Sequence, residues 1–333
     1  MGKKDARLTF GQNFVCGGFA GVTSRTITSP LDVVKILAQV GTKDSEGGFL
    51  ASFGNIYRNE GLKAFWKGNG IACVRLFPYS AIQFAAFNKL KESFSDENGN
   101  LTASKALLAG SMGGVTATVA VYPTDMVKTR LTVQHGTDAA KAKYKGIGHA
   151  FKTIAKEEGV SAFYKGLAPS ILGVIPFAGG TFMAYEVLGM LWQRPKSELG
   201  PAIQFANGCM AGAFAQTFSF PFDTIRKKMQ AQSKLVGDAK MVQADVQFSG
   251  TFDCFRQTVK QKGILGMWRG TTANLAKVAP YAGLMFFAFE ASKRYFLYKN
   301  GFTTSPFKEV HAAGVDQGMK PHELKAWLAA KEE

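Results

Sequence analysis

Three acid–base pairs with identical spacing are the first residues in the sequence that could do chemistry. They are Asp32 and Lys35 after Pro30, Asp125 and Lys128 after Pro123, and Asp223 and Arg226 after Pro221. In a helix, each acid lies one turn from its base on the same face. Around a threefold axis, each acid could reach the base of the neighbouring helix, which predicts a ring of three ion pairs. Charges in a low-dielectric interior are costly unless paired, so the ring is either a gate that opens when its pairs break or a purely structural element.

Three isolated cations form a second set of candidate residues. Arg25, Arg75 and Lys277 interrupt runs that are otherwise uncharged, and a cation in such a run is a candidate for binding a solute. Three unpaired cations around one cavity would suit an anion with more than one charge, and the planar fork of arginine suits phosphate. For each of these cations, and above all for Arg25, the alternative is a side chain that extends to the lipid headgroups. Gln83 and Asn274 are expected to add polar groups to the same cavity.

Six long apolar runs must position these residues. They cover residues 8–31, 69–87, 106–124, 167–185, 199–222 and 271–289. About 20 residues suffice for a helix to cross a bilayer core of about 30 Å. The runs therefore predict an all-α membrane protein with six transmembrane helices. Their Ser, Thr, Gln and Asn residues fit helices that line a wet interior.

Composition narrows the classes of function. The chain has 40 Lys+Arg against 24 Asp+Glu, a net charge of +16, which favours an anionic partner. No basic stripe with interleaved aromatic residues stands outside the spans, so nucleic acid is not expected. The four cysteines lack the spacing of a zinc site, and no phosphate-binding GxxxxGK[ST] loop is present. We therefore expect no cofactor and no enzymatic activity.

The acid–base motifs belong to a threefold internal repeat. A second motif follows each of them: Glu60-Gly61 to Trp66-Lys67-Gly68, Glu158-Gly159 to Tyr164-Lys165-Gly166, and Lys262-Gly263 to Trp268-Arg269-Gly270. The differences in length between the copies fall in polar loops near 40–50, 135–146 and 233–250. We expect repeats over 8–95, 102–195 and 199–298, followed by a tail over 299–333. Each repeat should contain two long helices with a short helix between them.

These motifs resemble the signature of the mitochondrial carrier family, Px[DE]xx[KR] followed by [DE]Gxxxx[WYF][KR]G, three times over. The resemblance implies a monomeric, multi-pass carrier of the mitochondrial inner membrane that works by alternating access. It makes the ring the matrix gate and implies that Gln39 and Gln230 brace it by hydrogen bonds, with Thr132 at the third such position. It also implies cardiolipin binding at three turns, where anchoring by interfacial aromatic residues is the alternative. The residues of these turns are Lys67, Gly68, Lys165, Gly166, Arg269 and Gly270.

A second gate is expected at the other ends of the even-numbered helices. The family pattern there is an aromatic residue, an acid, two residues and a base. Asn88 and Gly189 break this pattern. The charged residues that remain are Lys91, Glu186, Glu290 and Lys293. This cytoplasmic gate is therefore incomplete, which predicts a resting state that is open to the cytoplasm.

The solute is expected to be a nucleotide-like anion. Arg75 and Lys277 each lie seven residues after a closing glycine, and Gly173, followed by Val174, holds the third equivalent position. Within the family, glycine followed by an aliphatic residue resembles carriers of adenine nucleotides and coenzyme A, and glycine could leave room for a planar ring. One alternative is a smaller phosphate or carboxylate anion. Another is a non-transporting inner-membrane protein that dissipates the proton gradient or binds a partner.

Overall fold

A computed structural model describes residues 7–96, 102–134, 143–192, 200–232, 248–307, 310–311 and 315–332. These residues are almost entirely helical and contain no named strand. The long helices are α1 (Phe10–Val40), α3 (Asn69–Phe94), α4 (Ala103–Val133), α7 (Val174–Trp192), α8 (Pro201–Ala231) and α10 (Thr271–Lys299). The shorter ones are α2 (Phe49–Glu60), α5 (Ile147–Glu158), α6 (Leu167–Leu172), α9 (Thr251–Lys262) and α11 (Pro321–Glu332). Each of the six predicted spans therefore coincides with long helical segments.

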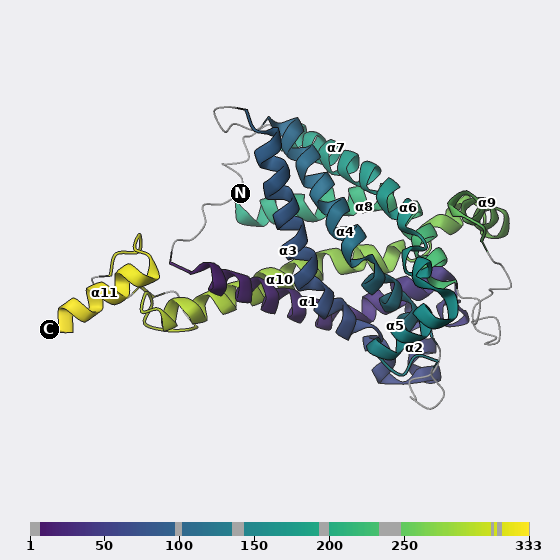
Figure 1. Ribbon diagram of the computed structural model, residues 1–333, viewed down its shortest axis with the longest axis horizontal. Helices are drawn as coiled ribbons and strands as arrows, with labels where there is room; N and C mark the ends of the chain where they lie inside the picture. Colours follow the sequence, from purple (N-terminus) through teal and green to yellow (C-terminus); the bar gives the residue numbers. More distant parts are fainter. Residues whose placement is uncertain are drawn as a thin grey trace. The chain divides into compact units, whose positions relative to one another are not determined.

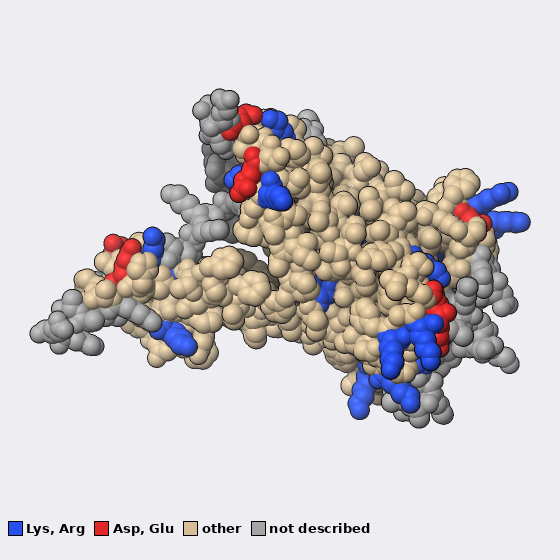
Figure 2. All heavy atoms as spheres, in the orientation of Figure 1, with Lys and Arg blue, Asp and Glu red and all other residues tan. Residues whose placement is uncertain are grey.

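Three helical segments of the described part are long and apolar enough to cross a membrane by length and composition: Leu62–Phe94, Ser104–Val133 and Val160–Thr181. The other three predicted spans lie in α1, α8 and α10, whose Ser, Thr, Gln and Asn residues lower the hydropathy. Figure 2 shows the visible side of α3, α4 and α7 as a surface almost without charged side chains, with Lys, Arg, Asp and Glu gathered near the helix ends. Such a surface fits contact with lipid.

The chain divides into two compact units, residues 28–279 and residues 1–27 with 280–333. In the larger unit α3 packs along α4, and α7 packs along α8 (Figure 1). Helices α2, α5 and α9 each bury one apolar face, with Ile56, Ile154 and Cys254 as buried members of three local cores. The larger unit thus contains the ends of the helices that carry the acid–base ring.

The smaller unit joins the chain's tail to the start of α1. Leu8, Leu297, Phe302 and Leu324 form its buried core. The Asn300 side chain exchanges two hydrogen bonds of 2.9 Å with Gln12 and also donates to the carbonyl oxygen of Arg7. The tail therefore folds onto the start of α1 and the end of α10, and it ends in α11.

The second even-numbered span is broken, unlike its counterparts α3 and α10. Helix α6 ends at Leu172 and α7 begins at Val174, with Gly173 between them. Pro176 has no N–H to donate to the carbonyl of Leu172, four residues earlier, which explains the end of the first segment there. Pro78 and Pro280 lie inside α3 and α10 without a break, so the interruption needs Gly173 as well as a proline.

Candidate solute site and gate

The three acid–base pairs form a closed ring across α1, α4 and α8. Lys35 Nζ on α1 lies 2.8 Å from Asp223 Oδ2 on α8. Lys128 Nζ on α4 lies 3.7 Å from Asp32 Oδ2 on α1. Arg226 on α8 forms an ion pair with Asp125 on α4, whose side chain is only 4% exposed. Each acid therefore pairs with the base of a neighbouring helix, as the spacing predicted.

Hydrogen bonds from the predicted bracing residues differ between the repeats. Gln39 Nε2 donates to Asp223 Oδ2 at 3.0 Å and so contacts the ring directly. Gln230 instead accepts hydrogen bonds through Oε1 from Thr129 Oγ1 at 2.7 Å and from Lys227 Nζ at 2.9 Å. Thr132 donates to the carbonyl oxygens at positions 67 and 128, not to a side chain of the ring.

Arg75 and Lys277 are not unpaired cations, and that expectation was wrong. Arg75 Nη1 lies 2.7 Å from Asp125 Oδ1, and Lys277 Nζ lies 2.6 Å from Asp32 Oδ1. Both side chains extend from even-numbered helices to carboxylates of the ring, so two of the three gate acids hold two cations each. The spacing gave no sign of this, because it placed the solute residues and the gate at separate depths.

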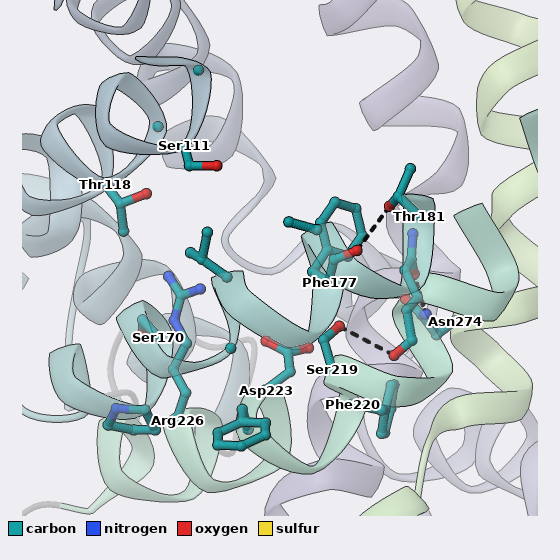
Figure 3. A pocket seen from close by; sticks show the side chains of 18 of the residues that line it. Ser111, Thr118, Ser170, Phe177, Thr181, Ser219, Phe220, Asp223, Arg226 and Asn274 are labelled. Atoms are coloured by element: carbon teal, nitrogen blue, oxygen red, sulfur yellow. Dashed lines mark hydrogen bonds between the residues drawn. The ribbon is translucent and has the colours of Figure 1, made fainter. Parts of the chain in front are cut away.

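A cavity of about 1130 Å³ lies next to the ring in the larger unit. Its lining includes three of the cations, Lys35, Arg226 and Lys277, and the predicted solute residues Gln83, Gly173, Val174 and Asn274. Arg75 is not among the residues that line it. Sequence reasoning missed the hydroxyl groups of the lining, which come from Ser111, Thr118, Ser170, Thr181 and Ser219. Figure 3 shows Arg226 and Asp223 in the lower part of the view, with Ser111 and Thr118 above them and Phe177 and Asn274 opposite.

Gly173 was expected to leave room for a planar ring. It lines the cavity, but the space that its missing side chain would fill is occupied. A Cβ at this position would lie 3.1 Å from Phe222 Cβ and 3.2 Å from the carbonyl oxygen of Pro169. Its small size therefore serves the close packing of the broken span against α8. The side of Gly173 on which a side chain would stand is already filled.

The remaining gate and solute residues lie as follows. Arg25 belongs to the smaller unit, where its Nε is buried without a hydrogen-bond partner in the described residues. Glu290 pairs with Arg294 on its own helix, at 3.6 Å. Lys91 is exposed near the end of α3 and Lys293 lies on α10, while the side chain of Glu186 lies outside the described residues. The incomplete cytoplasmic gate stays a prediction.

The turns that were expected to bind lipid have two other structural roles. The Lys67 ammonium pairs with Glu60 and donates to the carbonyl of Gln134 at 2.8 Å, and Lys165 pairs with Glu158 at 3.1 Å. The closing glycines Gly68, Gly166 and Gly270 have φ of 75°, 83° and 90°. A Cβ on each would lie 3.0 Å from the backbone carbonyl of a gate base in the next repeat: Lys128, Arg226 and Lys35, respectively. Cardiolipin binding at these turns stays a prediction.

Comparison with known proteins agrees with the threefold motifs. The family model "Mitochondrial carrier protein" matches residues 6–98, 99–196 and 197–300. Solute carrier family 25 member 43 of Danio rerio is 46% identical over 97% of this chain and 92% of its own length. The member 43 protein of Mus musculus is 45% identical over 97% of the chain and 94% of its own length. The mitochondrial adenine nucleotide transporter ADNT1 of Arabidopsis thaliana is 34% identical over 85% of this chain and 86% of its own length. The family match also confirms the predicted all-α, six-helix fold, and the chain therefore belongs to the mitochondrial carrier family, the multi-pass solute carriers of the mitochondrial inner membrane.

Proposed function

We propose that this carrier moves an adenine-nucleotide-like phosphate anion through the cavity beside the ring, by alternating access. Lys35, Arg226 and Lys277 supply positive charge, and the hydroxyls of Ser111 and Thr118 supply further hydrogen bonds. A volume of about 1130 Å³ is at the upper end for small-molecule sites, which leaves room for a nucleotide. The Arabidopsis relative named as an adenine nucleotide transporter supports the same solute class.

The excess of positive charge at the ring is the observation that carries the proposal. Three carboxylates hold five cations, because Asp32 and Asp125 each pair with a second cation, Lys277 and Arg75 respectively. The network therefore carries two positive charges that the ring itself does not neutralise. An anion with two or more charges would neutralise it, whereas a cation would be repelled.

The double pairing also gives a physical link between solute binding and gate opening. Lys277 lines the cavity and holds Asp32 at 2.6 Å, so a phosphate that binds its ammonium competes with that carboxylate. Asp32 would then keep Lys128, which lies farther away, at 3.7 Å. Because a ligand shifts a conformational equilibrium only by binding one state better, the competition supplies the required difference in affinity. The bound anion thus weakens one segment of the gate.

The second candidate solute is a smaller phosphate or carboxylate anion. The packing of Gly173 against Phe222 favours it, because the room that glycine was expected to leave for a base is occupied. The charge argument applies equally to both candidates, so the size and the planar group of the solute decide between them.

Thermal unfolding of the purified carrier against ATP, ADP, phosphate and small dicarboxylates tests the proposal. A ligand at a hundredfold excess over its dissociation constant stabilises the folded state by about 2.7 kcal/mol. We expect a rise in unfolding temperature with the nucleotides that is lost in Lys277→Met. Lys105→Met is the matched control, because Lys105 forms an exposed pair with Asp96 and is not among the residues that line the cavity. A shift with phosphate or dicarboxylates but with no nucleotide would refute the nucleotide proposal in favour of the smaller anion. No Lys277-dependent shift with any anion would refute both.

A further inference from the structure

One position holds an acidic residue of an ion pair in the first two repeats but a basic residue in the third. In the first repeat, Glu60 pairs with Lys67. In the second, Glu158 accepts from Arg130 at 2.5 and 2.9 Å and from Lys165 at 3.1 Å. The same positions in the third repeat hold Lys228 for Arg130, Lys262 for Glu158 and Arg269 for Lys165. A carboxylate between two cations is thus replaced by a third cation.

These three cations lie together where α8 meets α9 and the following turn. Lys228 on α8 is 8% exposed, and its Nζ donates to Thr258 Oγ1 on α9 at 3.0 Å. Lys262 is the last residue of α9, and Arg269 is exposed in the turn that opens α10. Each of the three is close enough to the other two to interact electrostatically. Within the described residues, no carboxylate forms an ion pair with any of them.

The cluster is costly without a counter-charge. An ammonium group has three donors, and Lys228 uses one of them on a neutral hydroxyl. Burial lowers the pKa of Lys262 and the charge of Arg269 lowers it further, while the charge of Glu46 raises it only in part. Buried charge of one sign destabilises a fold unless it is neutralised. In the second repeat a carboxylate neutralises the corresponding cations, because Arg130 donates to both oxygens of Glu158 at the position that Lys262 occupies in the third repeat.

We propose that Lys228, Lys262 and Arg269 bind a phosphate group in the place that a glutamate carboxylate takes in the other repeats. A phosphate presents two oxygens on one edge, as a carboxylate does, and forms strong charge-assisted hydrogen bonds with Arg and Lys. The exposed Arg269 gives the anion access to Lys262 and to the buried Lys228. None of the three residues lines the central cavity, so this site is separate from the proposed solute site. The phosphate comes either from a phospholipid headgroup or from free phosphate in the aqueous phase.

Exchanging the sign of one charge tests the proposal. Lys262→Glu restores the acid of the other repeats, so this variant should be more stable than the native chain without phosphate and should lose the stabilisation by phosphate that arises at this cluster. Lys260→Glu is the matched control, because Lys260 is exposed two residues earlier on α9. Thermal unfolding is measured in neutral detergent, with inorganic phosphate or with micelles that contain phosphatidic acid. Since the central cavity is intact in both variants, any phosphate bound there affects both equally.

The outcomes distinguish the two sources of phosphate, and they also show whether the proposal fails. A stabilisation by inorganic phosphate that Lys262→Glu loses and Lys260→Glu keeps assigns the site to free phosphate. The same pattern with phosphatidic acid alone assigns it to a lipid headgroup. Equal responses of the two variants to both probes would overturn the proposal, as would a Lys262→Glu variant that folds but is less stable than the native chain without phosphate. If Lys262→Glu does not fold, Lys262→Gln gives the same comparison, because it removes the charge without reversing it.

Discussion

Removing the charge of Lys277 tests whether a solute residue really holds the gate closed. Lys277→Met keeps most of the length of the side chain and removes its ammonium, which lies 2.6 Å from Asp32 Oδ1. At an effective dielectric constant of about 20, that distance corresponds to a gross attraction of about 6 kcal/mol, most of which desolvation offsets. A carboxylate left with no partner costs about 3–5 kcal/mol, but Asp32 keeps Lys128 at 3.7 Å. We therefore expect a loss of about 1–3 kcal/mol.

The assay is thermal unfolding of the purified protein without any anionic ligand. At about 2 °C per kcal/mol for a long chain, the variant should unfold about 2–6 °C below the native protein. Lys105→Met should change the unfolding temperature by much less, since its pair with Asp96 is exposed on both sides, and such pairs contribute about 0–1 kcal/mol. An unchanged or higher unfolding temperature for Lys277→Met would refute the idea that this lysine stabilises the closed ring. So would a native response to ATP in that variant.

Three further predictions concern the turns, a buried thiol and the bracing amide. Gly270→Ala should destabilise the protein by about 1–3 kcal/mol more than Gly263→Ala, because both have positive φ but only a Cβ at Gly270 would lie 3.0 Å from a backbone carbonyl of α1; equal unfolding temperatures would contradict this. Burial raises the pKa of the Cys254 thiol from an ordinary 9.0 to about 12, so the protein should lose stability as pH rises above about 9, where only the unfolded chain loses the thiol proton. In thermal unfolding measured at several pH values, Cys254→Ala should reduce this loss. Gln39→Leu should cost about 1–2 kcal/mol through its lost hydrogen bond to Asp223, and an unchanged denaturation midpoint would count against a bracing role.

Residue spacing was enough to predict the ring, because helical geometry fixes which side chains share a face. An acid and a base three residues apart must lie on one side of a helix, and threefold repetition gives each of them the same neighbour. The sequence thus led to a ring of three ion pairs between neighbouring helices, and the structure gives the partners as Lys35–Asp223, Lys128–Asp32 and Arg226–Asp125. The six long helices followed in the same way from the length of the uncharged runs.

Contacts made by the even-numbered spans could not be predicted in this way. Whether Lys277 reaches Asp32 depends on the rotation of α10 relative to α1 and on the reach of a flexible side chain, and neither leaves a periodic signal. The surroundings of Gly173 are likewise set by Phe222, a residue far away in the sequence. The break beside Gly173 did have a local signal, since Pro169, Gly173 and Pro176 lie within eight residues.

The closing glycines have a consequence for how the carrier changes state. Gly68 packs against the backbone of Lys128, Gly166 against that of Arg226, and Gly270 against that of Lys35, so each repeat touches the next in a closed cycle. Backbone in such close contact cannot move alone, and displacement of one gate base must displace the start of an even-numbered span in the preceding repeat. We therefore expect the three segments to open cooperatively, in one all-or-none step. A channel-like leak through a single open segment would be incompatible with this coupling.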